Sequence, residues 1–233
     1  MVTETQVPSG VKSIIDDAEA LYRKSASVTQ KNSIPDTVNI PIENPLHWLK
    51  IPDVICVYID MRGSTKLSAV THDNSTARIY QFYTGTAVKI FSEFEASYID
   101  VRGDGALALF DHNQAHRALA AAVSFRTFAT EVFIPLVTEA TDLDVGSHAG
   151  IDMRTVLVRK IGFKRYRGRS DRQNEVWAGR PVNMAAKLAA LSGDKELLVS
   201  KRYYDKLSSR YALKSCGCPG GEVVDLWSEK DIS

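Results

Sequence analysis

The stretch Val54-Ile55-Cys56-Val57-Tyr58-Ile59-Asp60-Met61-Arg62-Gly63-Ser64-Thr65 places a carboxylate at the end of an apolar, strand-like run. A second aspartate, Asp104, stands between two glycines just before the apolar run 106–110. A carboxylate at the tip of a buried strand is costly unless a cation compensates its charge. Two such carboxylates beside glycines therefore indicate a shared divalent-metal site that is open to phosphate groups.

The hydrophobic pattern on both sides of this stretch predicts an α+β fold. Strands are expected at 54–59, 98–101, 106–110, 145–151, 155–161, 197–200 and 223–227. Helices are expected at 11–26, 76–95, 114–138 (ending near Pro135), 182–191 and 202–207. The order β-α-β-β-α-β is the ferredoxin-like unit, here followed by extra C-terminal elements. Its first and third strands are adjacent, so Asp60 and Asp104 should be neighbours, and two close carboxylates repel each other unless a metal lies between them.

The composition of the chain is that of a globular protein. Its 233 residues are 44% hydrophobic and 24% charged, and a net charge of +1 gives no sign of a general nucleic-acid surface. Cys56, Cys216 and Cys218 favour neither a disulfide framework nor a zinc site, so we expect reduced thiols in a cytoplasmic protein. No signal peptide or membrane span is expected. Residues 1–52 are interpreted as an N-terminal helix and extended arm, and 53–233 as the domain that carries the metal site.

The turns beside the two aspartates allow a functional and a purely structural interpretation. Gly63 lets the backbone come close to a ligand, and Ser64 and Thr65 add hydroxyl groups that could bind a triphosphate. A simple strand-to-helix turn also explains these three residues. Asp104 could equally belong to an ordinary Asp-Gly hairpin turn, and only its pairing with Asp60 favours a metal site.

Two groups later in the chain could also contact phosphate. Asn183 and Lys187 are four residues apart and share a helix face, where they could stabilise charge on a phosphoryl group or form an ordinary surface pair. The basic run 160–172 is either a solvated loop or an arginine loop that clamps a triphosphate. Its spacing does not say which arginine would do so.

Four stretches in this order resemble the catalytic domain of class III nucleotidyl cyclases. They are Tyr58-Ile59-Asp60-Met61-Arg62-Gly63-Ser64-Thr65, Val101-Arg102-Gly103-Asp104-Gly105-Ala106, Val145-Gly146-Ser147-His148-Ala149-Gly150-Ile151 and Gly179-Arg180-Pro181-Val182-Asn183-Met184-Ala185-Ala186-Lys187-Leu188. The resemblance runs from about Val54 to Trp227 and implies that 53–233 is a cyclase catalytic domain. It also implies a head-to-tail homodimer with composite active sites.

The resemblance assigns roles to individual residues. Two divalent cations, Mn or Mg, would be held by Asp60, Asp104 and the backbone of Met61. Asn183 of the other chain, together with Lys187, would stabilise the transition state. The phosphate-binding residues would be Gly63, Ser64, Thr65 and Arg169. The reaction would be attack of the ribose 3′-hydroxyl on the α-phosphate with release of pyrophosphate.

The chain departs from the family at the positions that read the base. Adenylate cyclases carry a lysine six residues before the second metal aspartate and an aspartate seven residues before the asparagine, where this chain has Tyr98 and Val176. The glutamate and small polar residue of guanylate cyclases are absent there too. Lys187 stands where the family usually has an arginine, and the family's late lysine has no clear counterpart near 219–221.

The loss of the purine-reading pair favours a pyrimidine substrate. Tyr98 is bulkier than a lysine tip and would narrow the base pocket, which disfavours a two-ring base. In this the chain resembles the Pycsar pyrimidine cyclases of bacterial antiphage defence, whose cyclic nucleotide is read by a separate effector protein. We therefore expect UTP, or less readily CTP, as substrate, and no nucleic-acid or membrane partner. The alternatives are a purine cyclase with an atypical pocket and a cyclase-like module that binds nucleotide without catalysis.

Overall fold

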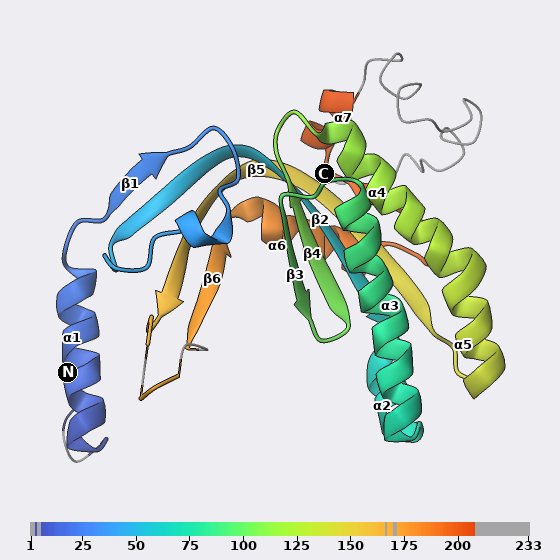
Figure 1. The fold of residues 1–233 in the computed structure, drawn as a ribbon, viewed down its shortest axis with the longest axis horizontal. Coiled ribbons are helices and arrows are strands. Elements are labelled where there is room, and N and C mark those ends of the chain that lie inside the picture. Colours follow the sequence, from blue (N-terminus) through green and yellow to red (C-terminus); the bar gives the residue numbers. More distant parts are fainter. Residues whose placement is uncertain (1–2, 4–5, 166, 170–171, 208–233) are drawn as a thin grey trace.

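The computed structural model describes residues 3, 6–165, 167–169 and 172–207, so the strand expected at 223–227, Cys216 and Cys218 lie outside the described residues. Within these ranges the chain forms a curled, mostly antiparallel sheet (Figure 1). Its main path has the order β3-β4-β2-β5-β6, with β1 parallel to the start of β2 and β7 parallel to β5. The strands are β1 (Ser27–Gln30), β2 (His47–Arg62), β3 (Tyr98–Arg102), β4 (Gly105–Phe110), β5 (Gly146–Gly162), β6 (Gln173–Ala178) and β7 (Leu198–Val199).

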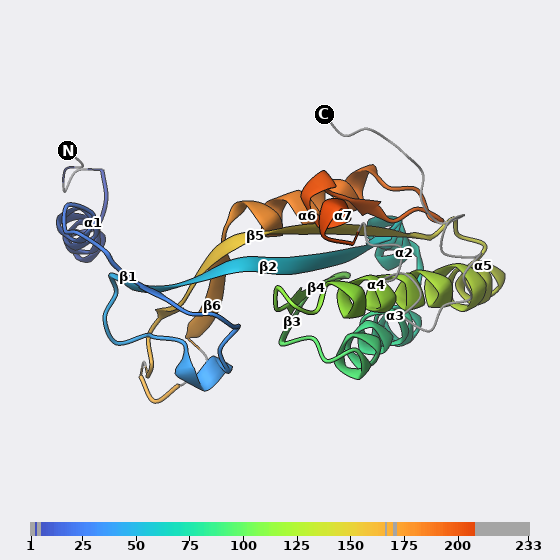
Figure 2. The same ribbon diagram turned by 90° about the horizontal axis from the view of Figure 1, so that it is seen from above.

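Helices cover both faces of the sheet, as Figure 2 shows. One face carries α3 (Asp73–Glu93), α4 (Ala115–Phe128) and α5 (Ile134–Thr141), and the other carries α6 (Arg180–Leu191) and α7 (Lys201–Leu207). The short α2 (Ser64–Val70) follows β2, and α1 (Ser9–Tyr22) stands apart at the N-terminal end. Alternate residues of β2 divide between the two cores, because strand side chains alternate. Ile55, Val57 and Ile59 pack with α3 and α4, whereas Val54 and Cys56 pack toward α6.

The order β2, α3, β3, β4, α4, β5 reproduces the predicted β-α-β-β-α-β pattern, and β2 lies between β4 and β5. Three expected boundaries are wrong. The first strand begins at His47 instead of Val54, because Pro52 and Asp53 form a bulge inside a continuous strand. Asp53 has a φ of 51°, and the pairing with β5 shifts between Ile51 and Val54.

The two strands expected at 145–151 and 155–161 are one strand, β5. Between the two expected ranges, Asp152 is fully buried, and one of its carboxylate oxygens lies 2.9 Å from Nε of Arg202 in α7. A buried carboxylate with a cationic partner can remain inside a strand.

The helix expected to end near Pro135 continues past it. A π-helical turn over 129–133 precedes α5, and Pro135 occupies the first turn of α5, where a missing N–H is tolerated. The continuous helical stretch Ala115–Thr141 is long and apolar enough to span a membrane, with a mean hydropathy of 1.4. Ala118, Ala121 and Phe125 are fully buried in the core of the domain, which is typical of a core helix of a folded domain.

Candidate active site

The two aspartates meet at one end of the sheet. Asp60 is the partner of Gly105 across β4 and of His148 across β5, and Asp104 occupies the turn that precedes Gly105. A Cβ atom on Gly105 would lie 2.9 Å from Oδ1 of Asp60, so the Asp60 carboxylate rests directly over this glycine. The adjacency of the first and third strands thus brings the carboxylates together, and glycine at 105 leaves room for them.

The electrostatics of this pair favour a cation. Burial raises the pKa of Asp60, and the negative charge of Asp104 raises it further, while His148 and the backbone N–H of Met61 act in the opposite direction. The pKa of the Tyr58 hydroxyl is raised by burial and by both carboxylates. Excess negative charge in a half-buried position is what a bound divalent cation relieves.

The ligand set suits magnesium or manganese better than zinc. Among the described residues, no three His, Cys, Asp or Glu side chains gather into a metal-binding group. Mg²⁺ is commonly held by one or two carboxylates together with substrate phosphates, whereas structural zinc sites use four protein ligands. Asp60 and Asp104 therefore fit a cation that arrives with a phosphorylated substrate.

Tyr83 supports the end of β2 from beneath. Its hydroxyl donates to the backbone carbonyl of Asp60 at 2.8 Å and lies 2.7 Å from Oγ of Ser147 in β5. The side chain is fully buried, and its ring lies edge-on to Phe125. Tyr83 falls in the predicted helix at 76–95. There it recurs with apolar residues at helical spacing, and this pattern predicts only that it belongs to the core. Its contact with the Asp60 backbone depends on tertiary packing.

Arg62 ties the same strand end to two loops. Its guanidinium donates two hydrogen bonds to Asp144, at 2.8 and 2.9 Å, and reaches Oδ2 of Asp194 at 2.9 Å. Asp194 also accepts a hydrogen bond from the backbone N–H of Ser147 at 3.1 Å. The loops before β5 and after α6 are thereby fastened beside Asp60.

The turn after Arg62 has the backbone geometry that glycine permits. Gly63 has a φ of 85°, and a Cβ atom there would lie 2.8 Å from the carbonyl oxygen of Asp144. Ser64 and Thr65 form the first turn of α2, with Ser64 half-buried and Thr65 exposed. The predicted phosphate-binding residues thus directly follow β2, the strand that carries Asp60.

Of the two predicted base-binding residues, the structure places Tyr98 on the same face as Asp60. Tyr98 packs against Trp177, with ring centroids 4.8 Å apart, and burial together with the charge of Asp100 raises the pKa of Tyr98 to about 12. Val176 pairs with Arg159 and, by strand alternation, points to the other side of β6 from Trp177. The sequence analysis did not single out Trp177, although it directly follows Val176.

Asn183 and Lys187 are both exposed on α6, as a helix with these residues four apart predicts. The helix lies directly on the backbone of β5, because a Cβ atom on Gly150 would be 2.3 Å from the carbonyl oxygen of Ala185. The end of α6 approaches the strand position opposite Asp60, where His148 Nδ1 donates to the carbonyl of Ser192 at 2.6 Å. Asn183 lies about 13 Å further back along the helix axis.

Arg169 lies far from the aspartates of its own chain. It is exposed in the connection between β5 and β6, beyond Gly162. His148 of β5 pairs with Asp60, and β5 extends about 45 Å from His148 to Gly162. Arg169, which follows Gly162, is therefore separated from Asp60 by about the length of this strand. Within one chain, the structure brings together Asp60, Asp104, Gly63, Ser64 and Thr65, but not Arg169.

The chain is similar to curated uridylate cyclases. It is 37% identical over 216 residues to the uridylate cyclase of Propioniciclava tarda, covering 91% of this chain and 69% of the relative. It is 31% identical to the uridylate cyclase of Micromonospora echinofusca, covering 99% of this chain and 75% of that one. No protein-family model matches the sequence.

Solved structures share the fold at lower identity. The adenylyl cyclase CyaB from Pseudomonas aeruginosa matches with a TM-score of 0.60 at 19% identity, over 69% of this chain and 82% of that one. The guanylyl cyclase Cya2 matches with a TM-score of 0.59 at 21% identity, over 69% and 80%. A class III adenylyl cyclase-like ATP-binding protein from P. aeruginosa gives 0.64 at 16% identity, over 88% and 44%. With this fold and its identity to the curated relatives, the chain is a nucleotidyl cyclase that belongs to the uridylate cyclase family.

Proposed function

We propose that this enzyme converts UTP into 3′,5′-cyclic UMP and pyrophosphate. The observation that carries the proposal is the Asp60–Asp104 pair, set in a chain 37% identical to a uridylate cyclase. In the reaction the ribose O3′ bonds to the α-phosphorus, the bond from that phosphorus to the bridging β-phosphate oxygen breaks, and the hydroxyl proton passes to solvent. CTP is the less favoured substrate, and an atypical purine cyclase is the alternative.

Asp60, Asp104 and the backbone of Met61 would hold two divalent cations, Mn or Mg. When bound, these cations lower the pKa of the 3′-hydroxyl and neutralise charge on the triphosphate. Gly63, Ser64 and Thr65 would contact the phosphates from the turn after β2. Tyr83 and Arg62 would keep the strand end in one position, so that the carboxylates are placed before substrate arrives.

The remaining phosphate contacts would come from a second copy in a head-to-tail homodimer. Asn183, Lys187 and Arg169 are exposed, and Arg169 lies at the far end of β5 from Asp60 in its own chain. In a composite site, Asn183 of one copy would donate to the phosphoryl oxygens held by the aspartates of the other. Lys187 and Arg169 would add positive charge around the leaving pyrophosphate.

The base would be selected at Tyr98. Its packing against Trp177 fixes the ring at the edge of the site, which leaves room for one ring of a base more readily than two. Val176, on the opposite side of β6, would act on the base only in a composite site or through the strand backbone. We further propose that the cyclic nucleotide is a signal read by a separate effector in antiphage defence, in the cytoplasm.

The test is a competition assay with the purified full chain, manganese chloride and equal UTP, CTP, GTP and ATP, with products resolved by mass. Cyclic UMP as the main product is expected, and cyclic CMP would revise the choice between pyrimidines. A cyclic purine nucleotide would overturn the argument from Tyr98. Asp60→Ala should abolish turnover, while Asp73→Ala, an exposed aspartate at the start of α3, serves as the matched control.

A further inference from the structure

The N-terminal helix α1 is amphipathic but stands apart from the other helices and strands of the described part of the chain. None of its residues is buried, and Ile14 and Tyr22 are 67% and 88% exposed. Figures 1 and 2 show it standing clear of the sheet and of the other helices. Its side-chain hydrogen bonds are local, for example from Lys12 to Asp16. A single helix of 14 residues is marginally stable in water, so its apolar stripe needs a surface to cover it.

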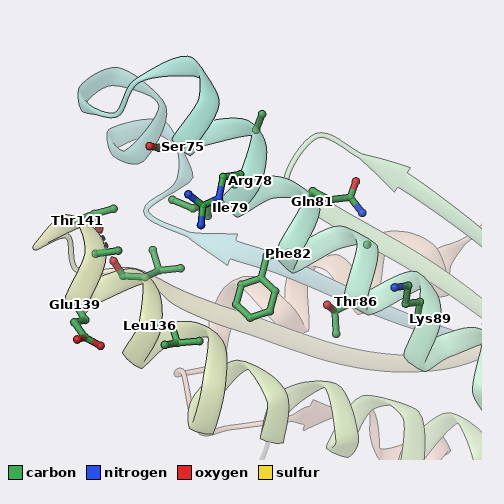
Figure 3. A pocket seen from close by; sticks show the side chains of 14 residues that line it. Ser75, Arg78, Ile79, Gln81, Phe82, Thr86, Lys89, Leu136, Glu139 and Thr141 are labelled. Carbon is green, nitrogen blue, oxygen red and sulfur yellow. Dashed lines mark hydrogen bonds between the residues drawn. The ribbon is translucent and has the colours of Figure 1, made fainter.

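A groove of matching character lies between α3 and α5, with a cavity volume of about 1200 Å³ (Figure 3). Phe82 points into the space between the two helices, and the half-exposed Leu136 forms the opposite wall. The α3 side of the groove runs from Ser75 to Lys89, about 21 Å, which is also the length of the 14-residue α1.

The charges of the helix and the groove are complementary. The polar face of α1 carries Asp16, Asp17 and Glu19, and the ion pairs of Asp16 with Lys12 and of Glu19 with Arg23 leave Asp17 to interact beyond the helix. The groove is lined by Arg78 and Lys89, with Glu139 as its acidic residue. An amphipathic helix that carries Asp17 on its polar face therefore fits the groove by its apolar stripe and by the sign of this charge.

The tether of α1 prevents it from reaching the groove of its own chain. Four residues, 23–26, join α1 to β1, so Tyr22 and Ser27 can be about 18 Å apart at most. Ser27 of β1 is paired with His47 at the start of β2. Helix α3 ends just before Tyr98 of β3, and Tyr98 lies level with Cys56 of β2, because both residues pair with Leu109 of β4. From His47 to Cys56 the strand alone covers about 30 Å, so the groove lies beyond reach while β1 stays paired.

We propose that α1 of one copy docks in the α3–α5 groove of a second copy of this chain. This contact between two copies lies on the face of the sheet that α3, α4 and α5 cover, opposite to the face that carries α6. The inference depends on the homodimer of the proposed function but not on its chemistry. Dimer contact and turnover can therefore fail separately.

The experiment places p-benzoyl-phenylalanine in place of Ile14 in the full chain and mixes it with ¹⁵N-labelled wild-type chain. After irradiation, cross-linked peptides are identified by mass spectrometry, and the label separates contacts between copies from contacts within one. Cross-links from position 14 to residues 75–89 or 136–141 of the labelled copy are expected. Leu136→Asp in the labelled copy should lower their yield by at least about tenfold, as loss of one buried leucine contact implies.

The matched control is Val132→Asp. Val132 is 41% exposed, close to the 50% of Leu136, and is not among the groove residues. The yield of cross-links from position 14 to the groove should therefore stay unchanged in this variant. Cross-links confined to one chain, cross-links to other surfaces, the absence of any cross-link, or a yield that Leu136→Asp leaves unchanged would each overturn the proposal. Occupation of the groove by residues 208–233, detected by the same placement of the photoprobe at Phe82, would overturn it as well.

Discussion

Removing the Tyr83 hydroxyl is the most direct way to test the support beneath Asp60. Tyr83→Phe keeps the ring and its contacts with Phe125 and Phe133, whose centroids lie 5.1 and 4.9 Å away, and deletes only the oxygen. The hydroxyl donates to the Asp60 carbonyl at 2.8 Å and contacts Ser147 Oγ at 2.7 Å. Two buried polar partners lose a hydrogen bond, so the free energy of unfolding should fall by about 2 kcal/mol.

The same change should weaken metal binding more than substrate binding. Groups that hold a metal ligand in place typically contribute about 10–100-fold to metal affinity or activity. We expect the manganese concentration for half-maximal turnover to rise about tenfold. The KM for the nucleotide at saturating manganese should change less, because Tyr83 lies beneath the strand and away from the substrate side.

The assay pairs urea unfolding of the metal-free protein with a manganese titration of turnover. Tyr80→Phe is the matched control: its hydroxyl lies in the same helix, one turn earlier, and contacts the exposed Ser68 hydroxyl at 3.1 Å. That control should change neither measurement by more than about 0.5 kcal/mol or twofold. If Tyr83→Phe behaves like Tyr80→Phe, the hydroxyl does not hold the Asp60 backbone and the reasoning fails.

Four other outcomes are expected. Asp60→Asn should stabilise the metal-free protein at neutral pH, because a raised folded-state pKa makes the ionised carboxylate unfavourable on folding; the gain should vanish in urea titrations below the unfolded pKa of about 3.8. Mixing inactive Asp60→Ala and Asn183→Ala chains should restore part of the turnover, and no recovery would argue against composite sites. Tyr98→Lys should relax base selection in the four-nucleotide competition, and unchanged selectivity would remove Tyr98 from the base pocket. Arg202→Met should cost about 3 kcal/mol in urea unfolding by leaving the fully buried Asp152 unpaired, and a loss below 1 kcal/mol would contradict that pairing.

The sequence predicts the meeting of Asp60 and Asp104 well, because it depends only on local patterns and one topology rule. The apolar run before Asp60 and the glycines around Asp104 fix the ends of two strands, and the β-α-β-β order makes those strands neighbours. The hairpin at Asp104 and the helix that carries Asn183 follow from similarly local signals.

What the sequence does not predict depends on tertiary contacts. Strand β1 is short and fully exposed, so no alternation marks it, and β6 lies next to a basic run that reads as a loop. The continuity of β5 through Asp152 involves the contact of this buried carboxylate with Arg202 of α7, which lies 50 residues further along the chain. Counting residues back from the asparagine selects Val176, but strand alternation puts its neighbour Trp177 against Tyr98.

The bulge at Asp53 has a mechanical consequence. Strand β2 is continuous, pairs with β1 near its start and carries Asp60 near its end. In the described pairing with β5, the bulge is the one place where the register shifts. A local change of twist at the bulge would reorient β1 and the start of β2. The end of β2 at Asp60 would stay in place, because the hydrogen bonds of Tyr83 and Arg62 hold it. Related chains could therefore reorient the N-terminal arm through changes at residues 51–54 without moving Asp60 and Asp104.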